Sequence, residues 1–434
     1  MKRLVFKFYP RELFFSILLV LIPVSSILES YFPNSFVSNT GYIDEVLCVV
    51  CSFYILYLSF KKGIKGIDLA LLIILLICTA WGFLCNVVSK VNTNWFPIVV
   101  DAICLLKIFV PFIMFKRIAE ADKKMALIDY LVPAAKLLII TGAFFGLISM
   151  FFDIGMTGDS TRYGIPQYNF IFVYGSRYGY MVACGLMLLN FTNMTKKQRI
   201  FYEVLSLFSM IIITKGVVYI VVIAYLLLKF LWRGNRPAVF TPSSLVIIAI
   251  GILAVSGYQI DNYLRNFNSP RMLFIRYGFE TANTYFPFGS GFATYGSDMA
   301  ARYYSPLYYL YGFDKVWGMS PGNTAFLNDG YLGMLFGQFG YIGFLLFVIM
   351  LIIIFSQILN INFKNKNIKA MEIALFVGIV VSSIGTAIIK SSTGVLVFSI
   401  LGIVCGYSKQ QAAQENGSPL LNNPRPGKIK IRLR

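Results

Sequence analysis

The chain has 434 residues, of which 58% are hydrophobic and 13% are charged, which excludes an ordinary soluble domain and is typical of a polytopic membrane protein. A formal net charge of +19 also fits nucleic-acid binding. The Lys and Arg residues cluster between hydrophobic runs, however, so we expect a lipid bilayer and no nucleic acid as partner. The sequence contains no His, which excludes His-dependent catalytic bases and His metal ligands.

Apolar runs that can cross a bilayer recur along the whole chain. Because a hydrocarbon core needs roughly 20 apolar residues in a helix, the sequence predicts about twelve transmembrane helices in an all-α polytopic fold. We expect roughly the first nine within residues 1–257 and the remainder within residues 337–407. The runs begin near Leu13, Asp44, Ile67, Trp95, Ile128, Ile165, Phe201, Gly216, Pro242, Tyr331, Met371 and Thr393.

Basic residues mark every second connection between these runs, and the short connections in between are poor in Lys and Arg. The positive-inside rule therefore predicts a multi-pass protein with both termini in the cytoplasm. The tail, residues 408–434, is polar and basic, and we expect it to be cytoplasmic and disordered.

A long polar stretch, residues 258–336, interrupts the hydrophobic pattern and falls on the outer face in this topology. Ser269 followed by Pro270 predicts a helix that begins there and runs toward Tyr285. The many aromatic residues suit either a sugar-binding surface or the core of the insert itself. The turn 287–292 is either a plain turn or a place where glycine N–H groups approach a phosphate. An insert of this length predicts recognition or chemistry, since a connection between two helices needs only a few residues.

Several charged residues occupy positions where charge is expensive. The run 201–214 makes about 21 Å of helix, too short for a bilayer, so we expect the turn at Lys215 at membrane depth. Arg177 falls in the middle of the sixth run. Both are candidates for function, with snorkelling as the alternative for Lys215 and a structural ion pair as the alternative for Arg177. Charges in or near the fourth and fifth runs can pair with one another: Asp101, Lys107 and Lys136.

The insert carries charges of its own. Arg276 and Glu280 are four residues apart and can form a surface salt bridge. Arg271 lies about half a rotation away from Glu280 on the same helix, which leaves it available for another anion. Asn328 and Asp329 stand where the tenth run begins, either as a helix cap or as functional groups.

These elements together resemble the O-antigen ligase and polymerase superfamily of membrane glycosyltransferases, in particular its Wzy-type polysaccharide polymerases. The turn around Lys215 is similar to the family's basic turn, where Arg is usual. Arg271 followed by residues 287–292 is similar to its Arg…Pro-x-x-Gly-x-Gly-aromatic element. Residues 328–343 are similar to its His-Asn-x-x-Leu…Gly-x-x-Gly element, but Leu327 stands in place of the His. That His is characteristic of the ligases, so its absence favours a polymerase.

The resemblance implies an enzyme of the bacterial inner (cytoplasmic) membrane that needs no metal and no cofactor. Such a polymerase transfers a growing glycan, of O-antigen or capsule, from undecaprenyl diphosphate to the sugar of another lipid-linked repeat unit. A chain-length regulator protein is a candidate partner. A leaving diphosphate is stabilised by fixed cations, for which the candidates are Arg271, Lys215, Arg177 and Arg276. A carboxylate is needed to deprotonate the acceptor hydroxyl, and the candidates are Glu280, Asp329 and Asp298.

Two other functions stay open. A flippase for lipid-linked oligosaccharides, or another secondary transporter, would also combine many spans with buried charges. The sequence shows no internal repeat, and a long one-sided insert does not serve two rocking halves. An O-antigen-ligase-like transferase is disfavoured by the missing His.

Overall fold

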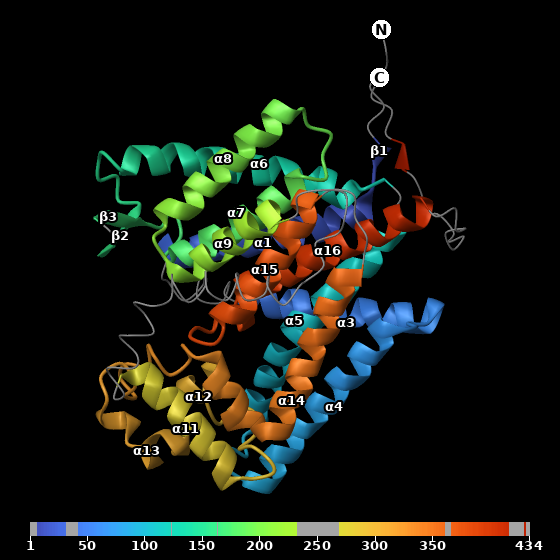
Figure 1. Ribbon diagram of the computed structural model, residues 1–434. Helices are drawn as coiled ribbons and strands as arrows, with labels where there is room; N and C mark the ends of the chain where they lie inside the picture. The colour runs from blue at the N-terminus through green and yellow to red at the C-terminus, as the bar shows by residue number, and fades with distance from the viewer. Residues whose placement is uncertain are drawn as a thin grey trace.

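The computed structural model describes residues 7–31, 42–122, 124–162, 164–231, 269–360, 366–415 and 429–430. Helices make up nearly all of the regular structure, and short strands form two small antiparallel sheets (Figure 1). The expectation of an all-α architecture is confirmed for these residues.

Seven of the described helices are long and apolar enough to cross a bilayer, which makes the chain a multi-pass membrane protein. They are α1 (Pro10–Tyr31), α3 (Ile43–Lys62), α4 (Ile67–Ser89), α5 (Trp95–Ala121), α6 (Ala126–Ser149), α14 (Tyr331–Asn360) and α16 (Ser392–Glu415). Shorter helices accompany them, namely α7 (Gly175–Leu189), α8 (Lys196–Ile212), α9 (Gly216–Leu231) and α15 (Lys366–Ser382). The run expected from Pro242 lies outside the described residues, so the count of about twelve spans stays a prediction.

The sixth run does not begin near Ile165, where the sequence predicted it. Residues Ile165–Tyr168 form strand β3, which pairs with β2 (Thr157–Arg162) in a hairpin. Pro166 suits an edge strand better than a helix interior, and Gly164 turns the hairpin with a φ of 76°. The helix α7 starts only at Gly175, whose N–H donates to the side chain of Asn169 at 2.9 Å.

The contact between α5 and α16 forms the centre of the molecule, and both helices are buried along most of their length. Gly402 and Gly406 lie one helical turn apart on α16. A Cβ at Gly402 would come within 2.4 Å of the carbonyl oxygen of Phe112, and one at Gly406 within 2.4 Å of that of Lys116. Only glycine lets the two backbones approach this closely, as in other membrane helix pairs.

The two ends of the described chain lie side by side. Strand β1 (Lys7–Phe8) pairs antiparallel with β4 (Ile429–Lys430), so both ends are on the same side of the molecule. That this side faces the cytoplasm stays a prediction. The expected disorder of the tail is wrong at its start, because α16 continues past Ser408 to Glu415.

The polar insert folds against the C-terminal end of α4 and the N-terminal part of α14 (Figure 1). It contains α11 (Pro270–Thr284), α12 (Asp298–Arg302), α13 (Pro306–Leu310) and the single turn η2 (Phe313–Lys315). The helix predicted from Ser269 toward Tyr285 is confirmed. Helix α14 breaks at Gly340, where φ is 62° and ψ is −164°, so residues 331–339 belong to the insert side and the spanning part follows. The expected boundary between residues 336 and 337 therefore falls inside the first piece.

Many aromatic residues of the insert form its own core rather than a surface. Phe274 stacks on Tyr295 with ring centroids 4.8 Å apart, and Tyr308 stacks on Phe313 at 5.7 Å. All these side chains are buried in one apolar cluster. The packing of these buried rings stabilises the fold of the insert beside the membrane helices. Tyr303, Tyr309 and Trp317 remain exposed, and a sugar-binding role for them stays a prediction.

Candidate functional site

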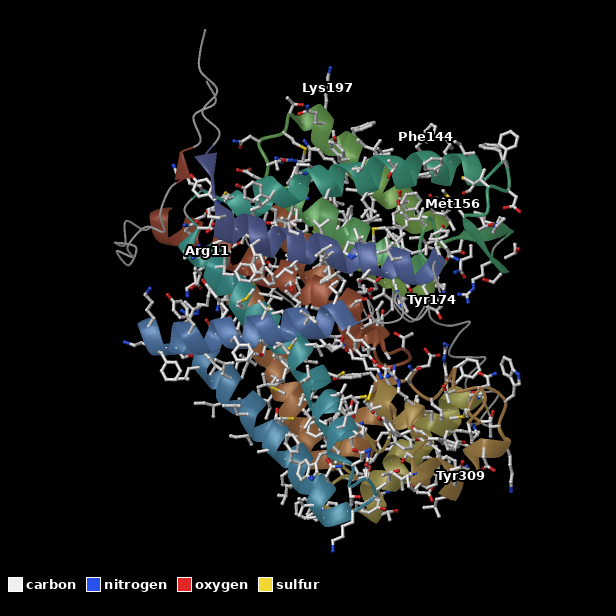
Figure 2. The ribbon with its side chains drawn as sticks, turned by 180° about the vertical axis from the view of Figure 1, so that it is seen from behind. Arg11, Phe144, Met156, Tyr174, Lys197 and Tyr309 are labelled. Atoms are coloured by element: carbon white, nitrogen blue, oxygen red, sulfur yellow. The ribbon has the colours of Figure 1, made fainter. Side chains whose placement is uncertain are left out.

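A cavity of about 1070 Å³ separates the insert from the ends of the membrane helices. Its wall is built by segments far apart in the sequence: the start of α3, the start of α7, the turn between α8 and α9, the helices α11 and α12, the segment before α14, and the turn η3 (Ile388–Lys390). Figure 2 shows Tyr174 at the end of the helices that faces the insert, far from Arg11 at the opposite end. Tyr174 is part of the cavity wall.

Arg177, Lys215 and Arg271, the predicted cations, all line this cavity. The guanidinium carbon of Arg177 lies 5.3 Å from the centroid of the Tyr174 ring, and Nζ of Lys215 lies 5.7 Å from the same centroid. One ring thus contacts two cations, which holds them close together despite their like charge. Arg162, from β2, adds a further positive charge to this wall, which the sequence reasoning did not single out.

Lys215 follows Thr214, whose backbone is left-handed with a φ of 53°, in the turn between α8 and α9. Burial lowers the pKa of Lys215, and the charges of Arg162 and Arg271 lower it further. Within the described part of the chain, no carboxylate lies within ion-pairing distance of Lys215. An anion in the cavity would therefore find a cation that is not already neutralised by a partner.

Arg271 is not left available in the way the sequence suggested. Its Nε donates to Oδ2 of Asp329 at 2.6 Å, and a second guanidinium nitrogen contacts the same oxygen. Arg276 and Glu280 point to solvent on α11, and these two described residues form no salt bridge. Neither of them lines the cavity. The structure therefore joins Arg271 with Asp329 and leaves Arg276 and Glu280 outside.

Two of the carboxylates that line the cavity, Asp298 and Asp329, have different electrostatic surroundings. Burial raises the pKa of Asp329, and Arg271 opposes this only in part. Lys390 is the main cause of the lowered pKa of Asp298, and a hydrogen bond from Asn328 at 2.5 Å supports the shift. The side chain of Asp298 is 56% exposed because it faces the cavity, whereas that of Asp329 is 25% exposed. Carboxylates with pKa values displaced in opposite directions are suited to different roles.

Lys390 is a second cation of the cavity wall, after Arg162, that the sequence did not single out. It is buried in η3, donates to the carbonyl oxygen of Gly296 at 3.1 Å and lies 3.8 Å from Asp298. Its signal in the sequence is a lone Lys in an otherwise uncharged connection between the last two apolar runs. The proximity of Lys390 to a carboxylate about ninety positions earlier becomes visible only in three dimensions.

The charges of the fourth and fifth runs do not pair with one another. Nζ of Lys107 lies 2.9 Å from Oδ2 of Asp44 and also contacts Glu45, and all three side chains line the cavity. Asp101 accepts hydrogen bonds from the N–H of Ala293 at 2.6 Å and from the amide of Gln338 at 2.7 Å. Lys107 is thus part of the cavity wall, while Asp101 holds the insert in place.

The glycine turn 287–292 does not present its N–H groups to a ligand. The N–H of Ser290 donates to the carbonyl of Gly337, and that of Gly291 donates to the carbonyl of Gln338, both at 2.8 Å. The N–H of Phe292 donates to Oδ1 of Asn86 at 2.7 Å. The plain-turn interpretation is therefore correct, since these donors fasten the insert to α4 and α14 and have no capacity left for a phosphate.

Leu327 is fully buried in the apolar core of the insert, whereas the next residue, Asn328, lines the cavity. A side chain at position 327 would reach the cavity only with a different local packing. Among the described residues, no group of three or more His, Cys, Asp or Glu side chains is arranged to hold a metal ion. In comparisons with known proteins, no family model matches the chain and no curated protein matches it significantly.

Proposed function

We propose that this chain is a membrane glycosyltransferase of the polysaccharide polymerase type, acting on glycans linked to undecaprenyl diphosphate at the outer face of the bacterial inner membrane. The observation that supports it most is the convergence of Arg177, Lys215 and Arg271 with Asp298 and Asp329 on one cavity. Arg binds phosphate oxygens in pairs, and Lys adds a point charge, so this wall suits a diphosphate.

In the proposed reaction, the acceptor hydroxyl oxygen attacks the anomeric carbon of the donor glycan. The bond from that carbon to the diphosphate oxygen breaks, and the hydroxyl proton passes to a carboxylate. Asp329 is the assigned base, because its raised pKa brings it nearer to the operating pH. The cations Arg177, Lys215 and Arg271 stabilise the charge that develops on the leaving diphosphate.

The pairing of Arg271 with Asp329 suits such a cycle. Before substrate binds, the guanidinium favours the ionised form of the carboxylate and opposes the rise in its pKa that burial causes. A diphosphate that competes for Arg271 releases Asp329 from this contact. The carboxylate then binds a proton more readily, at the moment when the acceptor hydroxyl has to lose one.

Deletion of the gene with analysis of surface glycan length tests the proposal. Loss of the long-chain ladder with retention of a single-repeat product is the expected result. Loss of all surface product, with lipid-linked repeats trapped on the inner side, would instead indicate a flippase. Loss of every glycan transferred to the final acceptor, with free lipid-linked polymer accumulating, would indicate a ligase-like transferase.

Complementation of the deletion strain with Arg271→Ala tests the site. We expect no polymer at normal expression, because the variant lacks a cation that meets the diphosphate and leaves Asp329 without its partner. Arg276→Ala is the matched comparison, since Arg276 lies on the same helix, is exposed and does not line the cavity. A normal ladder from Arg271→Ala, or equal loss from both variants, would contradict the assignment.

A further inference from the structure

A second cavity, of about 560 Å³, lies at the other end of α8. The turn at the C-terminal end of α8 lines the first cavity. The second cavity lies at the N-terminal end of α8, where α15 also begins and α9 ends. In the predicted orientation this end faces the cytoplasm. Among the described residues, its charged side chains are Lys196, Arg199, Glu203 and Lys229.

The described wall of the cavity carries three cations and a single carboxylate, so the cations are in excess there. Glu203 already accepts a hydrogen bond from the hydroxyl of Tyr225 at 2.9 Å and pairs with Lys229. Over the described residues, neither Lys196 nor Arg199 has a carboxylate within ion-pairing distance, and the buried Nε of Arg199 has no hydrogen-bond acceptor. A buried donor of this kind costs free energy unless a ligand satisfies it.

The helix ends add to the positive potential. The first turn of α8 contains Lys196, Lys197 and Arg199 and no acidic residue, although a helix N-terminus favours anions and disfavours cations. Helix α15 also has no acidic residue in its first turn, and its Asn367 lines the same cavity. An anion bound between these two N-termini would offset the repulsion between the basic side chains and the positive ends of the helix dipoles.

An apolar surface continues directly from the cavity. Ile200 is part of the cavity wall, and it is exposed together with Phe201 and Val204 on α8. Residues 200 and 204 share one face of a helix. A ligand that extends from the cavity along α8 would therefore have an anionic end and an apolar end.

We propose that this cavity binds the phosphate of an anionic phospholipid from the leaflet it faces, with Lys196 and Arg199 on the phosphate oxygens and an acyl chain along Ile200 and Val204. Basic pockets between membrane helices are suited to lipid headgroups. The site is separate from the proposed glycan chemistry. The bound lipid would anchor the N-terminal ends of α8 and α15 in that leaflet.

The test uses the full chain purified in nanodiscs of phosphatidylcholine with and without phosphatidylglycerol. Native mass spectrometry counts the lipids that stay bound. We expect the wild type to retain phosphatidylglycerol in preference to phosphatidylcholine, and the double variant Lys196→Gln/Arg199→Gln to bind it more weakly by roughly fivefold per cation removed. Lys61→Gln is the control, because it removes an exposed cation from the end of α3, outside the cavity.

A single variant and a competition experiment complete the test. Arg199→Gln alone leaves Lys196 and the capping box of α8 in place and serves if the double variant does not fold. Inorganic phosphate is added as a competitor, and no displacement of the lipid is expected because phosphate lacks the apolar part. Equal retention of phosphatidylglycerol by variants and wild type would overturn the site, and displacement by phosphate at equal concentration would overturn the lipid as its occupant.

Discussion

At the scale of single residues, Asp329 and Asp298 are two aspartates of one cavity in opposite electrostatic surroundings. Burial raises the pKa of Asp329, and the charge of Lys390 is the main cause of the lowered pKa of Asp298. Residue type and sequence position alone left these two and Glu280 equal as candidate bases. The tertiary structure separates them, because desolvation and the distance to a cation depend on neighbours from other segments.

The pH dependence of polymerisation by the purified protein should distinguish the two aspartates. A base must be deprotonated, so activity falls as the pH falls through the pKa of the base in the folded protein. If Asp329 is the base, the acidic limb lies above the ordinary Asp value of about 3.9, and if Asp298 is the base, it lies below. We expect the higher limb, measured as kcat/KM from pH 4 upward in lipid-linked repeat unit turnover.

Substitution of each aspartate by Asn tests the same assignment of the base. Asp329→Asn should lower the rate by roughly 10²–10⁴, the range for loss of a general base. Asp298→Asn should keep the acidic limb at the position of the wild type. A rate that survives in Asp329→Asn, or an acidic limb that disappears in Asp298→Asn, would assign the base to Asp298.

At the scale of elements, the insert is held by backbone contacts with α14 and α4. The turn containing Gly289 lies so close to the break in α14 that a Cβ at Gly289 would come within 2.3 Å of the carbonyl oxygen of Gln338. Asn86 on α4 fastens the same turn, since its amide donates to the carbonyl of Phe292 at 2.9 Å. The glycines of this turn therefore serve close packing, which places α11 and its Arg271 opposite the membrane helices.

Gly289→Ala should destabilise the protein by about 1–3 kcal/mol, the usual cost of forcing extra volume into a packed region. The atoms in the way belong to the backbone, so no side chain can rotate to make room. The expected readout is a lower melting temperature in detergent together with faster proteolysis of the insert. Gly322→Ala is the control in the same insert, because a Cβ there meets nothing within 4 Å. Equal melting temperatures for the two variants would contradict this account of the turn.

At the scale of the whole molecule, the cavity and the paired chain ends lie at opposite ends of the helices. Figure 2 shows Arg11 at one end and Tyr174 beside the insert at the other, with Tyr309 on the insert surface. The seven Cys residues of the chain are all buried. An introduced surface Cys is therefore the main target for a thiol reagent in the folded protein.

Labelling of intact cells with a membrane-impermeant maleimide should report the orientation. Tyr309→Cys, on the insert, is exposed and should react without permeabilisation, because the positive-inside rule predicts that the insert lies outside. Lys61→Cys, at the far end of α3, should react only after permeabilisation. The reverse pattern would invert the topology and move the proposed chemistry to the cytoplasmic face.

The sequence alone determined the membrane class, the position of most apolar helices, the helix that starts at Ser269, and the residues Lys215, Arg177 and Arg271 as charges of interest. Hydropathy and helix caps are local properties, so neighbouring residues suffice to predict them. Only the tertiary structure decided that Arg271 pairs with Asp329, that Lys390 accompanies Asp298, and that the glycine turn binds α14 instead of a ligand. These contacts join residues far apart in the chain, and their geometry depends on how closely whole helices approach one another.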